Sequence, residues 1–542
     1  MPDNARPMLK RIARKLLHEV KDAFTGTGNS PANMEIPDPA PGNIYLDRTE
    51  IARSDRYLPQ QTMTEEEREA IIAPLQCVRR LAALGYTGDD QSDPAVKMKE
   101  LSDSIEKELK QFLTPASELD NQNFEFSGTT VSELSKFIGR IRNDGAVRIM
   151  VTAGELIADD TLSVPSGIIL DGQGARIVPV GEEETKPDRL FVLDGVRDVC
   201  IRAFTIDACC EHGIFIKDSS RIILEDLTIR GFTGKGISLI GSNDTFRIGR
   251  CRIPDGEDGG ICINRDVSKG IIEDCTITGQ KSYENFSAGI LLGAVRVVNP
   301  DSPYNPFEDV RLETLTEAPH DMIIRNNCLD NNNAQGCYIH AGYRCYIIGN
   351  RITDNQKEGL CLDYGTAYCY VWRNDISGNG GRLRIARAGT EHLKLPGISL
   401  DNALYNIVCS NIFSGNHGSG IKIVRTGVRN VISGNTVCDN NKGVNERGHF
   451  FGIELASSLI PDRKDCIGLD FTPCYENTVT RNTITGPHYA GIFVGRDALR
   501  NDCIANTVTD STYWSVENLS EQPNTITNNI VDNKARGLRK EN

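Results

Sequence analysis

Short apolar runs with alternating spacing fill the chain from about residue 146 to near its end, and helical periodicity is absent there. A motif of glycine, apolar, any and apolar residue recurs as GIFI at 213, GISL at 236, GICI at 260, GILL at 289, GCYI at 336, GLCL at 359, GISL at 397, GIKI at 420, GIEL at 452 and GIFV at 491. The shortest gaps, by subtraction, are 23 residues, and the longer gaps indicate repeats that carry insertions. A repeat of this length built from short strands predicts a solenoid, because one repeat cannot bury its apolar face alone.

A second motif lies between the glycines and places asparagine at regular turns. It reads IIGNRITDN from 347 and VWRNDISGN from 371. Asparagine tolerates turn backbone, so we expect these side chains to hydrogen-bond from one coil to the next. A leucine-rich repeat is the competing solenoid at this period. It is disfavoured because the leucine scaffold and the helical segments are missing.

The rest of the chain divides by the same patterns. The predicted segments are an amphipathic helix at 1–24, a linker or extended arm at 25–62, a helical N-terminal region at 63–120, the solenoid at 121–535 with a helical cap at about 131–142, and a tail at 536–542. Within the helical region we expect one helix from Thr64 toward Leu84 and another from Pro94 to Phe112. The fold class is therefore all-β, with a small helical region before the solenoid.

Composition narrows the function classes. The 542 residues are 39% hydrophobic and 25% charged, which is typical of a folded protein, and no window resembles a membrane span. The net charge of −14 argues against nucleic acid as a partner. Local basic patches would still allow the protein to bind an acidic sugar. The absence of a signal-like segment and the 17 cysteines, which we expect to be buried thiols, favour a cytoplasmic protein. Apolar and basic faces at residues 9–21 suit a peripheral membrane or partner contact, or ordinary packing on the protein itself.

The glycine and asparagine repeats resemble those of the right-handed parallel β-helix superfamily, which includes pectate lyases, polygalacturonases, uronan epimerases and phage tailspikes. The resemblance covers about residues 125–535. VRIMVTAGELIADDTLSVPSGIILDGQGARI at 147–177 is similar to the first coils of that superfamily. The resemblance implies the solenoid fold and a sugar-chain ligand. It implies no single reaction, because several chemistries share this fold.

Aligning the repeats on their glycines turns the sequence into columns, with positions +1 and +3 facing inward and positions +2 and +4 facing outward. His340, Asp363 and Asp401 then fall on three successive coils of column +4. Lys422 and Glu454 follow on the next two coils of column +2. This grouping of reactive side chains predicts a site on one outward face, although a solvated surface would carry the same residue types.

The spacing of the carboxylates fits more than one reaction. Stacked strands would place Asp363 and Asp401 about 5 Å apart and Glu454 about 10 Å from Asp401. These separations suit either a retaining or an inverting glycosidase. In a lyase of the resembled kind the acids would hold calcium and Lys422 or Arg425 would be the base, so calcium is the one cofactor we would expect; no metal ligands are assigned.

Insertions at 293–322, 380–396 and 456–475 flank the same coils and would wall a groove. We therefore predict catalytic roles for Asp401, Asp363, Glu454 and Lys422. The substrate-binding residues that we predict are His340, Tyr364, Arg425, Arg384, Arg387 and His449. His488 precedes a strand, as His449 does, and is either a groove residue or a turn residue.

The leading hypothesis is a glycoside hydrolase or polysaccharide lyase that cleaves an acidic polysaccharide. The first alternative is an epimerase or intramolecular transferase acting on capsule or exopolysaccharide. The second is a glycan-binding solenoid without catalysis, such as a tailspike, for which the resemblance implies a homotrimer.

Overall fold

The fold is taken from a computed structural model of the chain. It describes residues 94–118, 123–141, 147–181, 187–207, 210–264, 266–282, 287–293, 318–363, 365–381, 394–401, 403–424, 427–441, 450–456, 474–496, 498–532 and 536–540. The predicted helices at 1–24 and 64–84 and the predicted arm at 25–62 lie outside these residues.

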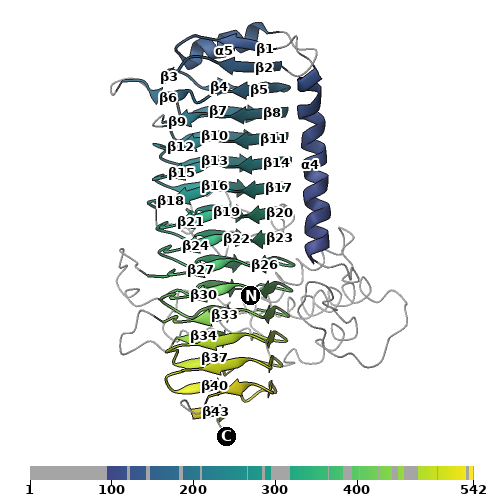
Figure 1. Ribbon diagram of the computed structural model, residues 1–542, viewed down its shortest axis with the longest axis vertical. Coiled ribbons are helices and arrows are strands. Elements are labelled where there is room, and N and C mark those ends of the chain that lie inside the picture. The colour runs from purple at the N-terminus through teal and green to yellow at the C-terminus, as the bar shows by residue number, and fades with distance from the viewer. Residues whose placement is uncertain are drawn as a thin grey trace, which may run out of the picture.

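Three parallel sheets run the length of the molecule, and each coil of the chain adds one strand to each of them (Figure 1). We call them sheet A, with 15 strands, and sheets B and C, with 14 strands each. After β7 the chain visits sheets C, A and B in turn, so strands three apart in the sequence are neighbours in space. This is the predicted β-helix solenoid, and the prediction of fold class is confirmed.

The strands of sheet A are β1 (Asn123–Phe126), β2 (Val147–Val151), β5 (Ile168–Asp171), β8 (Arg197–Arg202), β11 (Ser220–Glu225), β14 (Asn243–Gly249), β17 (Val267–Glu273), β20 (His320–Arg325), β23 (Tyr343–Ile348), β26 (Tyr370–Trp372), β29 (Ile407–Cys409), β32 (Val431–Ser433), β35 (Thr478–Thr480), β38 (Asp502–Ile504) and β41 (Thr525–Thr527). Those of sheet B are β3 (Glu155–Ala158), β6 (Arg176–Pro179), β9 (Thr205–Ile206), β12 (Thr228–Ile229), β15 (Arg252–Pro254), β18 (Thr276–Thr278), β21 (Cys328–Asp330), β24 (Arg351–Thr353), β27 (Asp375–Ser377), β30 (Ile412–Ser414), β33 (Thr436–Cys438), β36 (Thr483–Thr485), β39 (Thr507–Thr509) and β42 (Ile530–Val531). Those of sheet C are β4 (Leu162–Ser163), β7 (Arg189–Asp194), β10 (His212–Lys217), β13 (Lys235–Ile240), β16 (Gly259–Asn264), β19 (Ile290–Gly293), β22 (Cys337–His340), β25 (Leu360–Asp363), β28 (Ile398–Asp401), β31 (Ile421–Val424), β34 (Phe451–Ala456), β37 (Ala490–Val494), β40 (Trp514–Asn518) and β43 (Arg536–Lys540).

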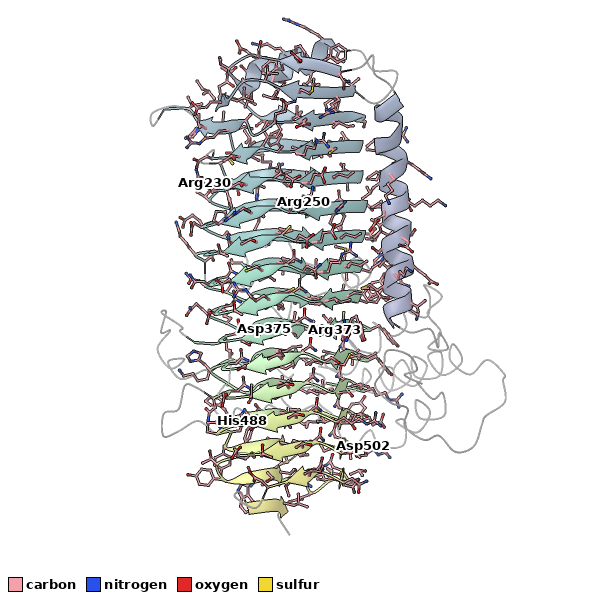
Figure 2. The ribbon with its side chains drawn as sticks, in the orientation of Figure 1. Arg230, Arg250, Arg373, Asp375, His488 and Asp502 are labelled. Carbon is pink, nitrogen blue, oxygen red and sulfur yellow. The ribbon has the colours of Figure 1, made fainter. Side chains whose placement is uncertain are left out.

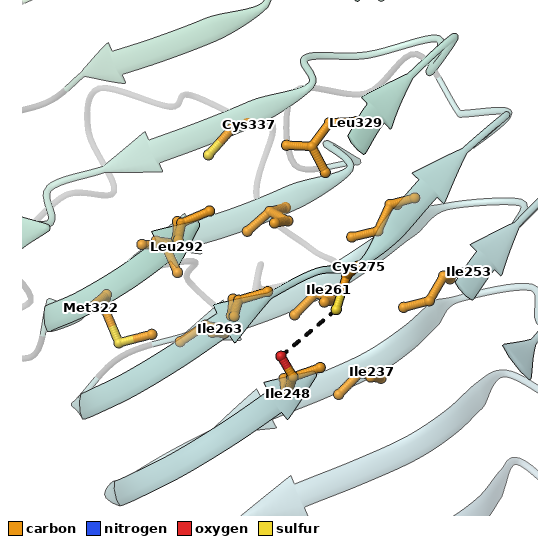
Figure 3. Packing of buried hydrophobic residues seen from close by; sticks show 14 of the residues in the cluster. Ile237, Ile248, Ile253, Ile261, Ile263, Cys275, Leu292, Met322, Leu329 and Cys337 are labelled. Carbon is orange, nitrogen blue, oxygen red and sulfur yellow. Dashed lines mark hydrogen bonds between the residues drawn. The ribbon is translucent and has the colours of Figure 1, made fainter. Parts of the chain in front are cut away.

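The core is a set of apolar columns inside the solenoid. Ile237 pairs with Ile261, and Ile261 with Ile290, so that equivalent side chains stack on successive coils (Figure 3). All three side chains have no exposed area. They occupy position +1 of the repeat, so the predicted inward direction of that position is confirmed.

The repeat glycine is required by space. A Cβ on Gly397 would lie 2.6 Å from Nδ2 of Asn416 and 2.8 Å from the carbonyl oxygen of Gly420 on the next coil. Real Cβ contacts are never that short. Glycine therefore recurs where the chain enters sheet C, because a side chain there would collide with the neighbouring coil.

Asparagine side chains form ladders along the turns. Asn374 donates from both its backbone nitrogen and its Nδ2 to Oδ1 of Asn411, at 2.9 Å each. Asn411 repeats this pattern toward Asn435 at 3.0 Å for each bond. The expected coil-to-coil hydrogen bonds are therefore present, and each amide satisfies buried backbone groups as well.

The short helix α5 (Val131–Arg140) covers the first coil. Val131, Leu134 and Ile138 are buried against the solenoid core. Oγ1 of Thr130 caps the helix by accepting from the backbone nitrogen of Glu133 at 3.1 Å. This end cap agrees with the helix predicted at about 131–142.

The helix α4 (Pro94–Glu118) lies along the outside of sheet A, across β11, β14, β17 and β20 (Figure 1). Its Ile105 and Leu109 are buried against outward side chains of that sheet. Arg325 of β20 approaches the helix at Glu106, with 3.7 Å between Nη2 and Oε1. The helix predicted from Pro94 is thus present and packs on the solenoid. No described helix is long and apolar enough to cross a membrane.

Ion pairs also link successive coils at the edge of sheet A. Arg250 lies 2.7 Å from Asp226 and 2.8 Å from Glu225 of the preceding coil (Figure 2). Side-chain bonding to Asp226 raises the pKa of Arg250 above its usual value. Such pairs offset the repulsion that like charges would produce in stacked columns.

Candidate functional site

The register of sheet C brings the predicted residues together on its outward face. His340 pairs with Asp363, and Asp363 with Asp401, on three successive coils. Lys422 pairs with Glu454 in the neighbouring column. Pairing is continuous across the gap between Asp363 and Asp401, so the intervening segment is an insertion within one coil, as the repeat gaps indicate.

A buried tyrosine joins two members of this column. The phenol oxygen of Tyr338 lies 3.0 Å from Oδ2 of Asp363 and 3.1 Å from Nδ1 of His340. Tyr338 and His340 are each 5% exposed, and Asp363 is half-buried. The two rings meet edge to face, with centroids 5.7 Å apart. Three reactive groups on two coils therefore form one hydrogen-bonded network.

The network assigns the protons. With Asp363 ionised, its carboxylate can only accept, so the Tyr338 hydroxyl donates to it and the phenol oxygen accepts from Nδ1–H of His340. Nε2 of His340 is then the ring nitrogen without a proton. Burial lowers the pKa of His340 to about 4. Burial, followed by the negative charge of Asp363, raises the pKa of Tyr338 well above its usual value. At neutral pH the imidazole is therefore neutral and the phenol is protonated.

A further carboxyl group of sheet C is that of Glu358. Glu358 precedes β25 at the opposite end of the strands from Asp401. Burial raises the pKa of Glu358 above its usual value, and the charge of Asp401 makes a smaller contribution to the rise. Nε2 of Gln335 donates to Oε2 of Glu358 at 3.2 Å. The patch thus combines carboxyl groups in different environments, which is a common feature of sites that transfer protons.

Lys422 and Glu454 form the C-terminal part of the patch. Nζ of Lys422 lies 3.0 Å from Oε1 of Glu454, and the two side chains are 34% and 10% exposed. Oγ of Ser419 donates to Oε2 of the same carboxylate at 2.7 Å. Both oxygens of Glu454 therefore have donors, and the carboxylate holds the ammonium group of Lys422 in place.

Sequence reasoning did not single out four residues of this patch. They are Tyr338, Glu358, Gln335 and Ser419. Tyr338 stands at +2 on the same strand as His340, so a search for paired reactive positions on one strand would have found it. The other three stand immediately before a repeat glycine, at a position outside the columns that the repeat alignment assigned.

Several predicted residues lie outside the described part of the chain. These are Tyr364, Arg384, Arg387, Arg425 and His449, with most of the three insertions. Their predicted roles stay predictions. His488 is described and is fully buried in the turn before β37 (Figure 2).

The side chains that could bind a metal ion are spread over the described residues. Among them no group of three or more His, Cys, Asp or Glu side chains could hold a metal ion.

Two family models match the sequence. A right-handed β-helix region matches residues 190–379, and a model described as a periplasmic copper-binding protein (NosD) matches residues 305–454. The described residues within the second range include no group of three or more His, Cys, Asp or Glu side chains that could hold a metal ion. No curated protein matches the chain.

Solved structures resemble the chain at low identity. The A-module of mannuronan C-5 epimerase AlgE6 from Azotobacter vinelandii is 14% identical, with 75% of this chain and 99% of that chain covered and a TM-score of 0.49. The periplasmic alginate epimerase AlgG is 13% identical, with 78% and 87% covered and a TM-score of 0.35. Dettilon tailspike protein is 11% identical, with 77% and 68% covered and a TM-score of 0.39.

The expected cytoplasmic location is wrong. The model that matches residues 305–454 describes a periplasmic protein. Cysteine content does not indicate the compartment here, because burial protects these thiols wherever the protein is located. Cys200, Cys251 and Cys337 are all unexposed, and burial raises the pKa of Cys200 to about 12.

Coils of three parallel strands, stacked apolar columns and the match over residues 190–379 agree with one another. The chain therefore has the fold of a right-handed parallel β-helix.

Proposed function

We propose that the protein modifies an acidic polysaccharide outside the cytoplasm, by moving the proton on the carbon next to a uronate carboxylate, as a sugar epimerase does. The observation that supports this most strongly is the network of Tyr338, His340 and Asp363. It joins a neutral base and a protonated acid on one face of sheet C. Epimerisation needs both, one to remove the proton and one to return it to the opposite face.

The partners of the carboxylates favour proton transfer over hydrolysis. A glycosidase uses two carboxyl groups, one as acid and one as nucleophile or base. Asp363 accepts from Tyr338, while Glu454 is held by Lys422 and Ser419. Each of these carboxylates already orients a neighbouring side chain. In a hydrolase, Asp363 and Glu454 would have to act on the substrate or on water instead.

Each residue of the network has a role that its geometry supports. Nε2 of His340 takes the proton from carbon, because the neutral ring carries no proton there. The hydroxyl of Tyr338 gives a proton to the carbanion, and the phenolate that remains takes the Nδ1 proton of the imidazolium. Proton exchange with water then returns the imidazole to its starting tautomer. Asp363 positions the hydroxyl. Proton transfer by such placed groups contributes about 10²–10⁴-fold to a rate.

The substrate carboxylate must be neutralised before its neighbouring carbon becomes acidic. Lys422 supplies a cation one coil beyond Asp401, and its side chain keeps 34% of its surface exposed while Glu454 fixes it. An ammonium group at this position would bind the uronate carboxylate and lower the cost of forming the carbanion. A neutral sugar would lack this contact.

One experiment separates the reaction classes. The protein is incubated in heavy water with oligomers of mannuronate, guluronate and galacturonate, and the products are analysed by NMR. We expect deuterium on the carbon next to the carboxylate, with no new chain ends. New saturated ends without deuterium at that carbon would establish hydrolysis and contradict the proposal.

β-Elimination is the second candidate, because it begins with the same proton removal. It differs in that the carbanion expels the neighbouring sugar oxygen and leaves a double bond. The unsaturated product absorbs ultraviolet light, so absorbance in the same incubation distinguishes it from epimerisation. Binding of oligomers without any product would instead indicate a glycan-binding solenoid.

A further inference from the structure

A group of aromatic side chains lies on sheet C beyond the Lys422–Glu454 pair. Phe451 and Phe493 are stacked, with ring centroids 4.2 Å apart and planes at 11°. Tyr489 meets Phe451 edge-on at 6.1 Å and lies 4.8 Å from Tyr513. We call these four residues the aromatic platform.

The platform continues the candidate site. Phe493 pairs with Glu454, which pairs with Lys422, so the three residues occupy one outward column on successive coils. Four strand steps separate Asp363 on β25 from Phe493 on β37. At about 4.8 Å for each step the distance along the sheet is roughly 19 Å. A short oligosaccharide extended along the sheet covers this distance, whereas a disaccharide does not.

The platform is supported from beneath and open above. Phe451 is 6% exposed and forms its base, while Tyr513 is 53% exposed. Tyr489 and Phe493 are half-buried. An exposed tyrosine ring that is held by a second ring loses little entropy on binding, and its hydroxyl remains in water. The apolar face of a pyranose ring suits such a surface, because its C–H groups are buried while its hydroxyls point outward.

We propose that the aromatic platform is a remote sugar-binding subsite, at which Tyr489 and Tyr513 stack on pyranose rings of the chain whose uronate is modified near Asp363. This inference rests on the proposed function for the identity of the glycan. Its occupant is a glycan because the platform is continuous with the polar patch that would bind the same chain. The subsite makes affinity depend on chain length.

The test measures binding of short and long oligomers by calorimetry, with Tyr338→Phe present in every protein to prevent turnover. The probes are oligogalacturonates and oligomannuronates of two or three and of eight or more sugars, with neutral cello-oligosaccharides alongside. We expect Tyr513→Ala to raise the Kd of the long chains about two- to tenfold relative to the short ones. The double variant Tyr489→Ala/Tyr513→Ala should raise it further. Tyr513→Phe should retain affinity because it keeps the ring.

Phe124→Ala is the matched control. Phe124 is a 36% exposed ring on β1, far along the solenoid from the platform, and its loss should leave the Kd of every probe unchanged. Equal binding of long chains by the double variant and its parent would overturn the subsite, even if polyuronate is modified. Loss of neutral long-chain binding in the double variant, without modification of any polyuronate by the wild type, would support the subsite and contradict the acidic substrate.

Discussion

The phenol oxygen of Tyr338 lies 3.0 Å from Oδ2 of Asp363, on the next coil of sheet C. Neither residue alone is unusual for an outward face. Their contact exists because the register aligns the two coils, and it fixes the direction of the Tyr338 hydroxyl proton. That direction in turn determines which nitrogen of His340 is protonated.

Replacing Tyr338 with phenylalanine removes only the hydroxyl. If that hydroxyl returns the proton to carbon, product formation should fall about 10²-fold or more. The free energy of unfolding should also fall by about 1–3 kcal/mol, because the buried imidazole of His340 loses its partner. Deuterium incorporation into oligouronate and urea denaturation measure the two quantities.

Tyr370→Phe is a suitable control for that change. Tyr370 is 4% exposed on sheet A, so the same atom is removed from an equally buried phenol away from the patch. Its turnover should equal that of the wild type. An equal loss of turnover in both variants would assign the effect to stability and contradict the role of Tyr338.

The ion pair of Lys422 and Glu454 should contribute measurably to the free energy of unfolding. Lys422→Met leaves the Glu454 carboxylate 10% exposed without its cation, which should cost about 1–3 kcal/mol of unfolding free energy. Adding Glu454→Leu removes the stranded charge and should restore part of the loss. Urea denaturation of the two single variants and the double variant measures the coupling. Strictly additive losses would show that the two groups do not interact.

The fold was predictable because its signal is repeated. Ten glycine motifs report one spatial constraint, which Gly397 illustrates through the crowding between Asn416 and Gly420. Asparagine at fixed turn positions reported the ladders in the same way. A constraint that recurs in every coil can be recognised in a single sequence, because the sequence contains several independent copies of the same pattern.

The site was only partly predictable, because its parts occur once. The column of His340, Asp363 and Asp401 followed from register alone. Glu358 did not, because the turn before each repeat glycine breaks the alternation that the columns assume. Which groups touch across coils depends on side-chain rotamers, and the sequence pattern does not encode them.

Removing one asparagine from the middle of a ladder should destabilise the solenoid. Asn411→Ala deletes the acceptor for two donors of Asn374 and the bonds from Nδ2 to Asn435 and to the carbonyl oxygen of Val371. Unsatisfied buried groups cost about 1–3 kcal/mol each, so we expect a loss of several kcal/mol. Thermal and urea denaturation measure it.

The end of the same ladder supplies a matched control. Asn529 accepts from Asn506 in a part-buried position, where water can replace the lost side chain. Asn529→Ala should therefore cost clearly less than Asn411→Ala. Equal losses would show that burial does not increase the contribution of these side-chain hydrogen bonds to the free energy of unfolding.

Stability should fall on mild acidification, because two buried histidines resist protonation. Burial lowers the pKa of His340 and of His488 to about 4, from a usual value of 6.5. Between these pH values the unfolded chain binds protons that the folded chain does not, so the unfolding free energy decreases as the pH falls from about 6.5 toward 4. Each histidine contributes roughly 3 kcal/mol at most to this loss. Above pH 7 both states are neutral at these positions and the effect disappears.

His488→Asn tests this without touching the candidate site. His488 is fully buried, and neither ring nitrogen has a hydrogen bond within the described chain. The variant should show a smaller decrease in unfolding free energy between pH 6.5 and 4.5, measured by urea denaturation, while its stability at pH 8 changes less. His320→Asn is the control, because that ring is only half-buried and lies beside Asp321 at 2.8 Å. A pH dependence identical to the wild type in His488→Asn would mean that the buried ring accepts a proton as readily as a histidine in the unfolded chain, contrary to its burial.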